Sequence, residues 1–224
     1  MKKILFATSN PTKAKRFSKG LEKHDIEVIT LKDIGTEVDV EENGKDAIEN
    51  ALIKARVYSD IVDIPVFAMD DNLYLENVPK EKQPGMFVRR VNGKRLNDDE
   101  MIEHYISLVK KYGTDGKLTC RWVYGMAVIN NGVENTYTWS KEDFYMVDKV
   151  SDKVNPGYPL NSISINKKLD KYFTEITEED KLMIQEDESD VVDFIVSCLK
   201  DKRKGGRLWV NIEIHIVVRL MNLT

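Results

Sequence analysis

The sequence predicts an α/β fold with a mixed, twisted central sheet flanked by helices. Short apolar runs alternate with amphipathic stretches in the first half of the chain, which is typical of a partly parallel sheet. Later, two long β-rich segments flank Asn130-Asn131-Gly132, a hairpin signal that adds antiparallel strands. The length of 224 residues suits one large domain or two small lobes around a shared substrate cleft.

In the first half, three predicted strands alternate with two predicted helices. In order, they are strand 2–7, helix 12–23, strand 26–31, helix 45–62 and strand 64–69. The first helix places Ala14, Phe17 and Leu21 on one face, at the spacing of an amphipathic helix. The third strand runs into Asp70-Asp71, and we expect it to end at this acidic pair.

The middle of the chain combines a capped helix with the predicted hairpin. Asn97 followed by Glu100 resembles a capping box, and Gly113 closes the amphipathic helix that follows. Residues 117–129 and 133–147 are rich in β-forming side chains and make the two arms of the hairpin. This part of the sheet is expected to be antiparallel.

The last quarter of the chain predicts a helix and then a different kind of segment. Residues 177–201 carry an apolar face at helical spacing. A basic, glycine-containing linker follows, and residues 208–220 alternate in the manner of a strand. We therefore expect one two-lobed domain over residues 1–204. Residues 205–224 form a linker with either an extra strand or a tag-derived tail.

Composition and charge exclude several classes of partner. The 34 Lys and Arg against 38 Asp and Glu give a net charge of -4, which provides no overall attraction to nucleic acid or to an anionic membrane. No run of 18 apolar residues is present, and the N-terminal apolar run turns polar at Thr8, too early for a signal peptide. A soluble, cytoplasmic protein is expected.

Cysteine and histidine give no catalytic or zinc-binding pattern. Cys120 and Cys198 are interpreted as buried small hydrophobic residues rather than as a disulfide framework. His24, His104 and His215 lack the spacing of a zinc site or of a nucleophile relay. A bound metal must then be held by carboxylate oxygens, which favours Mg²⁺ or Mn²⁺.

Three polar groups have both an ordinary and a functional interpretation. Asp70-Asp71 is either an acidic turn or part of a ligand-binding site, because ligands in open α/β sheets bind beyond the carboxyl ends of strands. Neighbouring side chains on a strand point to opposite faces, so the two carboxylates share one role only if the backbone turns there. Lys13 is a surface lysine or a phosphate ligand near a helix N-terminus. Asn50 and Lys54 lie four apart on one helix face, which alone indicates a solvated polar stripe.

The joint order of these groups is more specific than any one of them, and it resembles the inosine triphosphate pyrophosphatase family. The similarity is strong over about residues 2–91 and weak beyond. It rests on Thr8-Ser9-Asn10-Pro11-Thr12-Lys13, on Glu42-Asn43-Gly44 leading to Glu49-Asn50-Ala51-Leu52-Ile53-Lys54-Ala55, on Asp70-Asp71 and on Pro84-Gly85 followed by Arg90. Gly157-Tyr158 and Glu178-Glu179-Asp180-Lys181 resemble later family motifs less closely.

The resemblance implies hydrolysis of a nucleoside triphosphate to monophosphate and pyrophosphate, with Mg²⁺ (Mn²⁺ as an alternative), by a homodimer. It implies that Asp71 activates water and that Lys13 takes part in catalysis. The implied metal ligands are Glu42, Asp70 and Asp71. The implied substrate contacts are Thr8, Asn10, Lys13, Lys54, Arg90 and, for stacking on the base, Tyr158. Such roles suit phosphoryl transfer, which depends on positioning and charge neutralisation.

The chain departs from the family where the base is recognised. The Ser-His-Arg signature of the family falls on Gln185-Glu186-Asp187, and an Asp that precedes a Pro in the family is Pro159 here. Two interpretations stay open: base binding is lost or the register slips, or Glu186 and Asp187 contact a different base. The main hypothesis is a pyrophosphatase with altered base specificity. The alternatives are a nucleotide-sensing protein without turnover and a phosphatase for another metabolite.

Overall fold

The computed structural model describes residues 1–8, 10, 13, 16–36, 38–155, 157–184 and 188–200. Within them, seven strands form one mixed sheet in the order β2-β1-β3-β6-β7-β8-β9. β1 runs parallel to β2 and β3, and the other neighbours are antiparallel, so the predicted fold class is confirmed. The strands of this sheet are β1 (Lys2–Phe6), β2 (Ile26–Thr30), β3 (Val66–Leu75), β6 (Lys117–Asn130), β7 (Val133–Val147), β8 (Ser164–Asn166) and β9 (Lys171–Tyr172).

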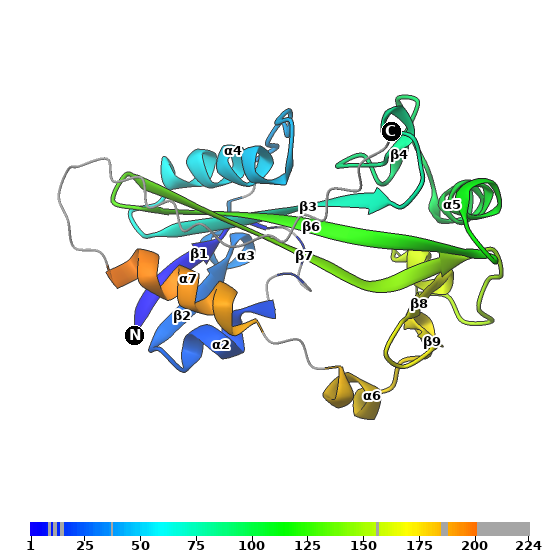
Figure 1. Ribbon diagram of the computed structural model, residues 1–224. Helices are drawn as coiled ribbons and strands as arrows, with labels where there is room; N and C mark the ends of the chain where they lie inside the picture. Colours follow the sequence, from blue (N-terminus) through cyan, green and yellow to red (C-terminus); the bar gives the residue numbers. More distant parts are fainter. Residues whose placement is uncertain are drawn as a thin grey trace, which may run out of the picture.

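Helices cover both faces of the sheet (Figure 1). They are α2 (Ser18–Glu22), α3 (Leu31–Ile34), α4 (Ala47–Ser59), α5 (Asp98–Tyr112), α6 (Glu178–Met183) and α7 (Ser189–Lys200). In Figure 1, α4 lies above the sheet, α2 and α7 lie below it, and α5 lies at the opposite end of the long strands. Among the described residues, no helix is long and apolar enough to cross a membrane.

Short elements complete the fold. A second, two-stranded sheet pairs β4 (Arg90–Val91) with β5 (Lys94–Arg95). Three single turns of 3₁₀ helix are η1 (Lys80–Lys82), η2 (Pro159–Ser162) and η3 (Phe173–Glu175).

The core divides according to the alternation of side chains along β3. Phe67 and Met69 pack in the cluster that includes α2 and α7, whereas Val66 and Ala68 pack in the cluster beneath α4. Further along the same strand, Leu73 belongs to a third cluster, which includes α5. The long strands therefore connect one packed body around α2, α4 and α7 with another around α5.

The predicted helix cap and hairpin are confirmed. The Asn97 side chain accepts a hydrogen bond from the Glu100 amide at 2.9 Å, and the Glu100 carboxylate accepts one from the Asn97 amide at 3.0 Å. α5 ends at Gly113. Between β6 and β7, Asn131 and Gly132 have φ angles of 50° and 75°, the positive values that a two-residue turn of the primed type requires.

The cysteines are confirmed as buried, free residues. Burial raises the pKa of the Cys120 thiol to about 12. The neutral thiol is therefore the form present near pH 7, as expected for a small hydrophobic residue in a core.

The prediction that a strand ends at Asp70-Asp71 is wrong. β3 continues through both residues to Leu75, and each is paired with β6, Asp70 with Gly125 and Asp71 with Tyr124. Because β6 supplies hydrogen-bonding partners along this whole length, the two carboxylates do not interrupt the ladder. The pair thus lies in the middle of a ten-residue strand.

The prediction of one helix over 177–201 is also wrong. α6 ends at Met183, and α7 begins at Ser189. The apolar stripe starts only at Val191, whereas Leu182 in α6 is 74% exposed, so α6 lacks the buried face that would extend the longer helix.

Some predictions fall partly or wholly outside the described residues. Of the first predicted helix, Lys13 and Arg16 are helical, and Phe17 and Leu21 are buried as expected, whereas Ala14 is outside the described part. The C-terminal segment 205–224 also lies outside it, and so the domain boundary stays a prediction.

Gly125 allows α4 to lie close to the sheet. A Cβ atom at this position would be 2.4 Å from the backbone carbon of Ala47 and 2.4 Å from the amide nitrogen of Ile48. These are rigid atoms in the first turn of α4. The absence of a side chain opposite Asp70 therefore fixes how near this helix comes to β3 and β6.

We expect Gly125→Ala to destabilise the protein by about 1–3 kcal/mol, because the added methyl group must push a helix backbone away from the sheet. Chemical denaturation of the variant and the wild type measures this loss. Thr136→Ala, at an exposed position of β7, is the matched control and should change stability by less than about 0.5 kcal/mol. Equal stability of the Gly125→Ala variant and the wild type would contradict the close packing.

Candidate active site

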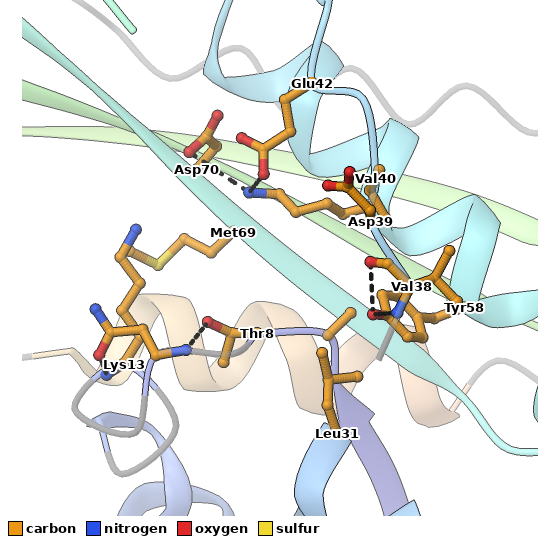
Figure 2. Close-up of a pocket in the computed structure, with 13 residues that line it drawn as sticks. Thr8, Lys13, Leu31, Val38, Asp39, Val40, Glu42, Tyr58, Met69 and Asp70 are labelled. Carbon is orange, nitrogen blue, oxygen red and sulfur yellow. Dashed lines mark hydrogen bonds and ion pairs between the residues drawn. The ribbon is translucent and has the colours of Figure 1, made fainter. Parts of the chain in front are cut away.

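A cavity of about 650 Å³ opens beside the carboxyl end of β1 (Figure 2). Its size is in the range of small-molecule sites in proteins. Its walls come from the segment after β1, the start of α3, residues 38–42, α4 and the middle of β3. The lining residues are Ala7, Thr8, Asn10, Lys13, Leu31, Val38, Asp39, Val40, Glu42, Lys54, Tyr58, Met69 and Asp70.

Lys54 joins two carboxylates at one side of this cavity. Its Nζ atom is 3.4 Å from Glu42 Oε1 and 3.5 Å from Asp70 Oδ1. The side chains of Lys54 and Asp70 are only 14% and 15% exposed. Ionic contacts with this little solvent are screened weakly. The three groups therefore form a charged cluster contributed by α4, β3 and the loop before α4.

Asn50 supports this cluster from one turn earlier in α4. It is 1% exposed, and its Oδ1 atom accepts a hydrogen bond from the Gly44 amide at 2.8 Å. This bond holds the turn that follows Glu42 against the helix. The interpretation of Asn50 and Lys54 as part of a solvated polar stripe is wrong, because both side chains are largely buried.

Lys13 and Asp71 form a second ion pair on the other face of β3. The loop that carries Lys13 is held by its own side chains: Thr8 Oγ1 accepts from the Asn10 amide at 3.2 Å, and Asn10 Oδ1 accepts from the Lys13 amide at 3.3 Å. Thr8, Asn10 and Lys13 all line the cavity. Four predicted residues of the N-terminal motif and of β3 therefore come together here.

Asp70 and Asp71 point to opposite faces, as expected for neighbours on a continuous strand. Asp70 meets Lys54 beneath α4, and Asp71 meets Lys13 on the side of α2. The strand thus assigns different partners to the two carboxylates. Asp71 is not brought to the same ammonium as Glu42 and Asp70.

Arg90 and Tyr158 do not line the cavity. Arg90 is exposed in β4, and Tyr158 is 47% exposed before η2. Their two loops are nevertheless joined to each other through neighbouring residues, described next. Glu186 and Asp187 lie outside the described residues, so their contact with the base stays a prediction.

A three-way network connects these two loops with the start of α5. Arg89 Nη1 donates to Asp98 Oδ1 at 2.7 Å, and Arg89 Nη2 donates to the Gly157 carbonyl at 3.3 Å. The Gly157 amide donates to Asp98 Oδ2 at 2.9 Å. The hydrogen bond from Arg89, followed by that from the Gly157 backbone, lowers the pKa of Asp98. Asp98 therefore stays ionised near neutral pH and holds both loops.

Two parts of the cavity wall, Tyr58 and the segment 38–40, were not predicted from the sequence. The Tyr58 hydroxyl accepts from the Val38 amide at 2.9 Å and donates to the Val38 carbonyl at 3.4 Å. One signal was available, because Tyr58 lies four residues after Lys54 on the same helix face. No local pattern marks residues 38–40 as its partner.

The donor set suits a hard divalent cation. Glu42 and Asp70 converge on one ammonium, and oxygen ligands are those that Mg²⁺ prefers. The described residues include no group of three or more His, Cys, Asp or Glu side chains placed to hold a metal. A site of one or two carboxylates is nevertheless usual for Mg²⁺ that also binds substrate phosphates.

Comparisons with known proteins agree with this geometry. The model of the Ham1 family matches residues 4–187. A protein named dITP/XTP pyrophosphatase from Bacillus subtilis (strain 168) is 30% identical over 181 residues, covering 81% of this chain and 89% of the relative. One of the same name from Wigglesworthia glossinidia brevipalpis is 32% identical over 188 residues, covering 82% and 90%.

The fold also has solved counterparts. The structure of the Staphylococcus aureus Ham1 protein superposes with a TM-score of 0.68 at 21% identity, covering 88% of this chain and 99% of that one. A HAM1 protein from Coxiella burnetii superposes with a TM-score of 0.66 at 20% identity, covering 89% and 98%. These likenesses concern the fold.

Proposed function

The chain belongs to the Ham1 family, and on this premise we propose that it hydrolyses a nucleoside triphosphate to the monophosphate and pyrophosphate. The observation that carries the proposal is the pair of lysines, Lys13 and Lys54, which line one cavity while carboxylates of β3 hold both ammonium groups. Relatives at about 30% identity bear the name dITP/XTP pyrophosphatase, which supports the same class of reaction.

The charges of the cavity support a divalent cation in the reaction. Three of the lining residues are acidic, Asp39, Glu42 and Asp70, and two are lysines. A triphosphate would meet these acids with its own negative charges, and such repulsion has to be neutralised. Glu42 and Asp70 would hold Mg²⁺ or Mn²⁺, which would bridge to phosphate oxygens and neutralise the charge that develops.

The residues of this chain divide the remaining work. Lys13 and Lys54 bind phosphate oxygens, and Thr8 and Asn10 shape the loop beside them. When a phosphate draws the Lys13 ammonium away, the Asp71 carboxylate becomes free to accept a proton from water. The water oxygen then bonds to phosphorus, and the bond from that phosphorus to the pyrophosphate oxygen breaks. Arg90 and Tyr158 remain candidates for phosphate binding and base stacking.

We further propose that base recognition differs from that of the relatives named dITP/XTP pyrophosphatase. Glu186 and Asp187 stand where the family has hydrogen-bond donors. Carboxylates accept hydrogen bonds, and so does the purine O6 of hypoxanthine or xanthine; facing each other, two acceptors stay unpaired at a cost of about 1–3 kcal/mol. A base that presents N–H donors, such as guanine or an amine-bearing pyrimidine, suits these side chains better.

A panel of nucleoside triphosphates tests both proposals. With Mg²⁺ present, we expect release of pyrophosphate rather than orthophosphate, and a higher kcat/KM for guanosine or amine-bearing pyrimidine triphosphates than for inosine triphosphate. Orthophosphate as the product would favour a phosphatase, and binding without turnover would favour a sensing protein. Inosine triphosphate as the best substrate would contradict the altered specificity alone.

Asp71→Asn should lower kcat by about 10²–10⁴-fold, the range for loss of a positioned general base, with a smaller effect on nucleotide binding. Steady-state kinetics together with calorimetric binding separate the two quantities. Asp60→Asn, at an exposed position after α4, is the matched control and should keep wild-type turnover. Full activity of a folded Asp71→Asn variant would exclude Asp71 as the base.

Glu42→Gln should raise the Mg²⁺ concentration needed for half-maximal activity by about 10–100-fold, because one anionic ligand is lost. A metal titration at saturating nucleotide measures the shift. Glu49→Gln provides the control, since the Glu49 side chain accepts from the Lys45 amide at 2.9 Å and does not line the cavity. If the Mg²⁺ requirement is unchanged in Glu42→Gln, Glu42 is not a metal ligand.

A further inference from the structure

Arg16 lies three residues after Lys13, and its guanidinium lies over Tyr124, the residue paired with Asp71 in the sheet. We propose that Arg16, together with Glu188, is a positioning residue that fixes where the Lys13 side chain begins, so that its ammonium group can reach both Asp71 and a phosphate in the cavity. The proposal rests on the proposed function, in which Lys13 binds phosphate and Asp71 accepts a proton. Arg16 and Glu188 do not line the cavity, but in this proposal they set the geometry of the Lys13–Asp71 pair.

The register of the sheet places Asp71 in one row with Tyr124 and Trp139. Asp71 is paired with Tyr124 of β6, and Tyr124 is paired with Trp139 of β7. The three side chains therefore form a row across three strands on one face. The rings of Tyr124 and Trp139 are stacked, with centroids 5.0 Å apart and an interplanar angle of 19°. Lys13 and Arg16 both contact this row, at Asp71 and at Tyr124 respectively.

The Arg16 guanidinium lies among three aromatic rings. Its Cζ atom is 4.9 Å from the ring centroid of Tyr124, 5.8 Å from that of Trp139 and 5.3 Å from that of Phe17. A guanidinium within about 6 Å of aromatic centroids gains cation–π attraction, and the gain is larger where solvent is excluded. Arg16 is thus attached to the ring that lies directly beside Asp71 in the sheet.

Arg16 also forms an ion pair with Glu188, which Lys141 shares. Arg16 Nε donates to Glu188 Oε1, and Lys141 Nζ is 3.7 Å from the same oxygen. The side chains of Arg16, Glu188 and Lys141 are 20%, 15% and 18% exposed. Glu188 is itself held at the start of α7, because its carbonyl accepts from the Val192 amide at 3.0 Å. Removal of one member of such a sheltered set leaves charge without its partner.

These contacts bear on Lys13 because both residues meet adjacent members of the same row. Lys13 pairs with Asp71, and Arg16, three residues later, lies over the Tyr124 ring, so the contacts of Arg16 limit where the Lys13 side chain starts. Lys13 itself is held by the hydrogen bond that its backbone amide donates to Asn10 Oδ1 and by the ion pair with Asp71. Arg16 therefore contacts the core of the sheet three residues after Lys13, and Glu188 links Arg16 to the start of α7.

The test uses the full chain and compares Arg16→Gln, Arg16→Lys and a matched control. Arg56→Gln is that control, because it removes an arginine whose two contacts, both with Glu134 at 2.7 Å, involve no residue of the cavity lining. The first readout is kcat and KM for the best nucleoside triphosphate. The second is the rate at which a limiting amine-acylating reagent labels Lys13, measured by mass spectrometry, which does not depend on turnover.

In Arg16→Gln we expect kcat to fall by about 10–100-fold, as misplacement of a reacting group does, while Lys13 is labelled faster than in the wild type. Arg16→Lys should give an intermediate loss, because an ammonium keeps the charge but lacks the planar fork that stacks on rings. Arg56→Gln should change neither kcat nor Lys13 labelling. If Arg16→Gln does not fold, Glu188→Gln is measured in its place with the same expectations.

Wild-type kcat and unchanged Lys13 labelling in a folded Arg16→Gln variant would overturn the proposal. So would equal losses in Arg16→Gln and Arg56→Gln, which would mean a general loss of stability. If the wild-type protein releases no pyrophosphate from any nucleotide, the proposed function fails, and the labelling of Lys13 alone then decides whether Arg16 positions it.

Discussion

The site depends on the uninterrupted antiparallel pairing of β3 with β6. This ladder keeps Asp70 and Asp71 in an extended backbone, and an extended backbone sends neighbouring side chains to opposite faces. Each carboxylate therefore meets a lysine from a different direction, Lys54 from α4 and Lys13 from the loop after β1. Had the chain turned at the acidic pair, both groups would have been free to share one partner.

The approach of α4 is the second constraint. Gly125 lies opposite Asp70 in the ladder, and its missing side chain lets the first turn of α4 contact the sheet backbone. Along the same helix, Asn50 holds the turn after Glu42, and Lys54 reaches Glu42 and Asp70. The cluster therefore results from backbone packing as much as from the charges, and it is built on rigid elements, as precise sites require.

Both lysines of the cavity are already paired with carboxylates. A phosphate that binds these lysines has to compete with Asp70, Glu42 and Asp71. Binding of the phosphate would therefore be coupled to the release of a carboxylate from its lysine. The same acids offer oxygen ligands to a divalent cation that the substrate would carry in. This balance explains why a chain with net negative charge can have a site for a polyanion, since the local groups decide the interaction.

Local patterns were sufficient for the alternating strands and helices in the first half of the chain, the Asn97 cap and the Asn131-Gly132 turn, because caps and turns depend on neighbouring residues alone. The order of the motifs was sufficient for the family. The short elements α3, β4, β5, β8 and β9 and the break between α6 and α7 were not predicted. Six residues of the joint motif line one cavity, and their roles stay predictions: Thr8, Asn10, Lys13, Glu42, Lys54 and Asp70. Tertiary structure alone decided that β3 continues past Asp71, that Asn50 is buried and that Arg16 meets Tyr124 and Glu188. These outcomes depend on the register between segments far apart in the chain, and burial and pairing at that distance leave no periodic signal in a single sequence.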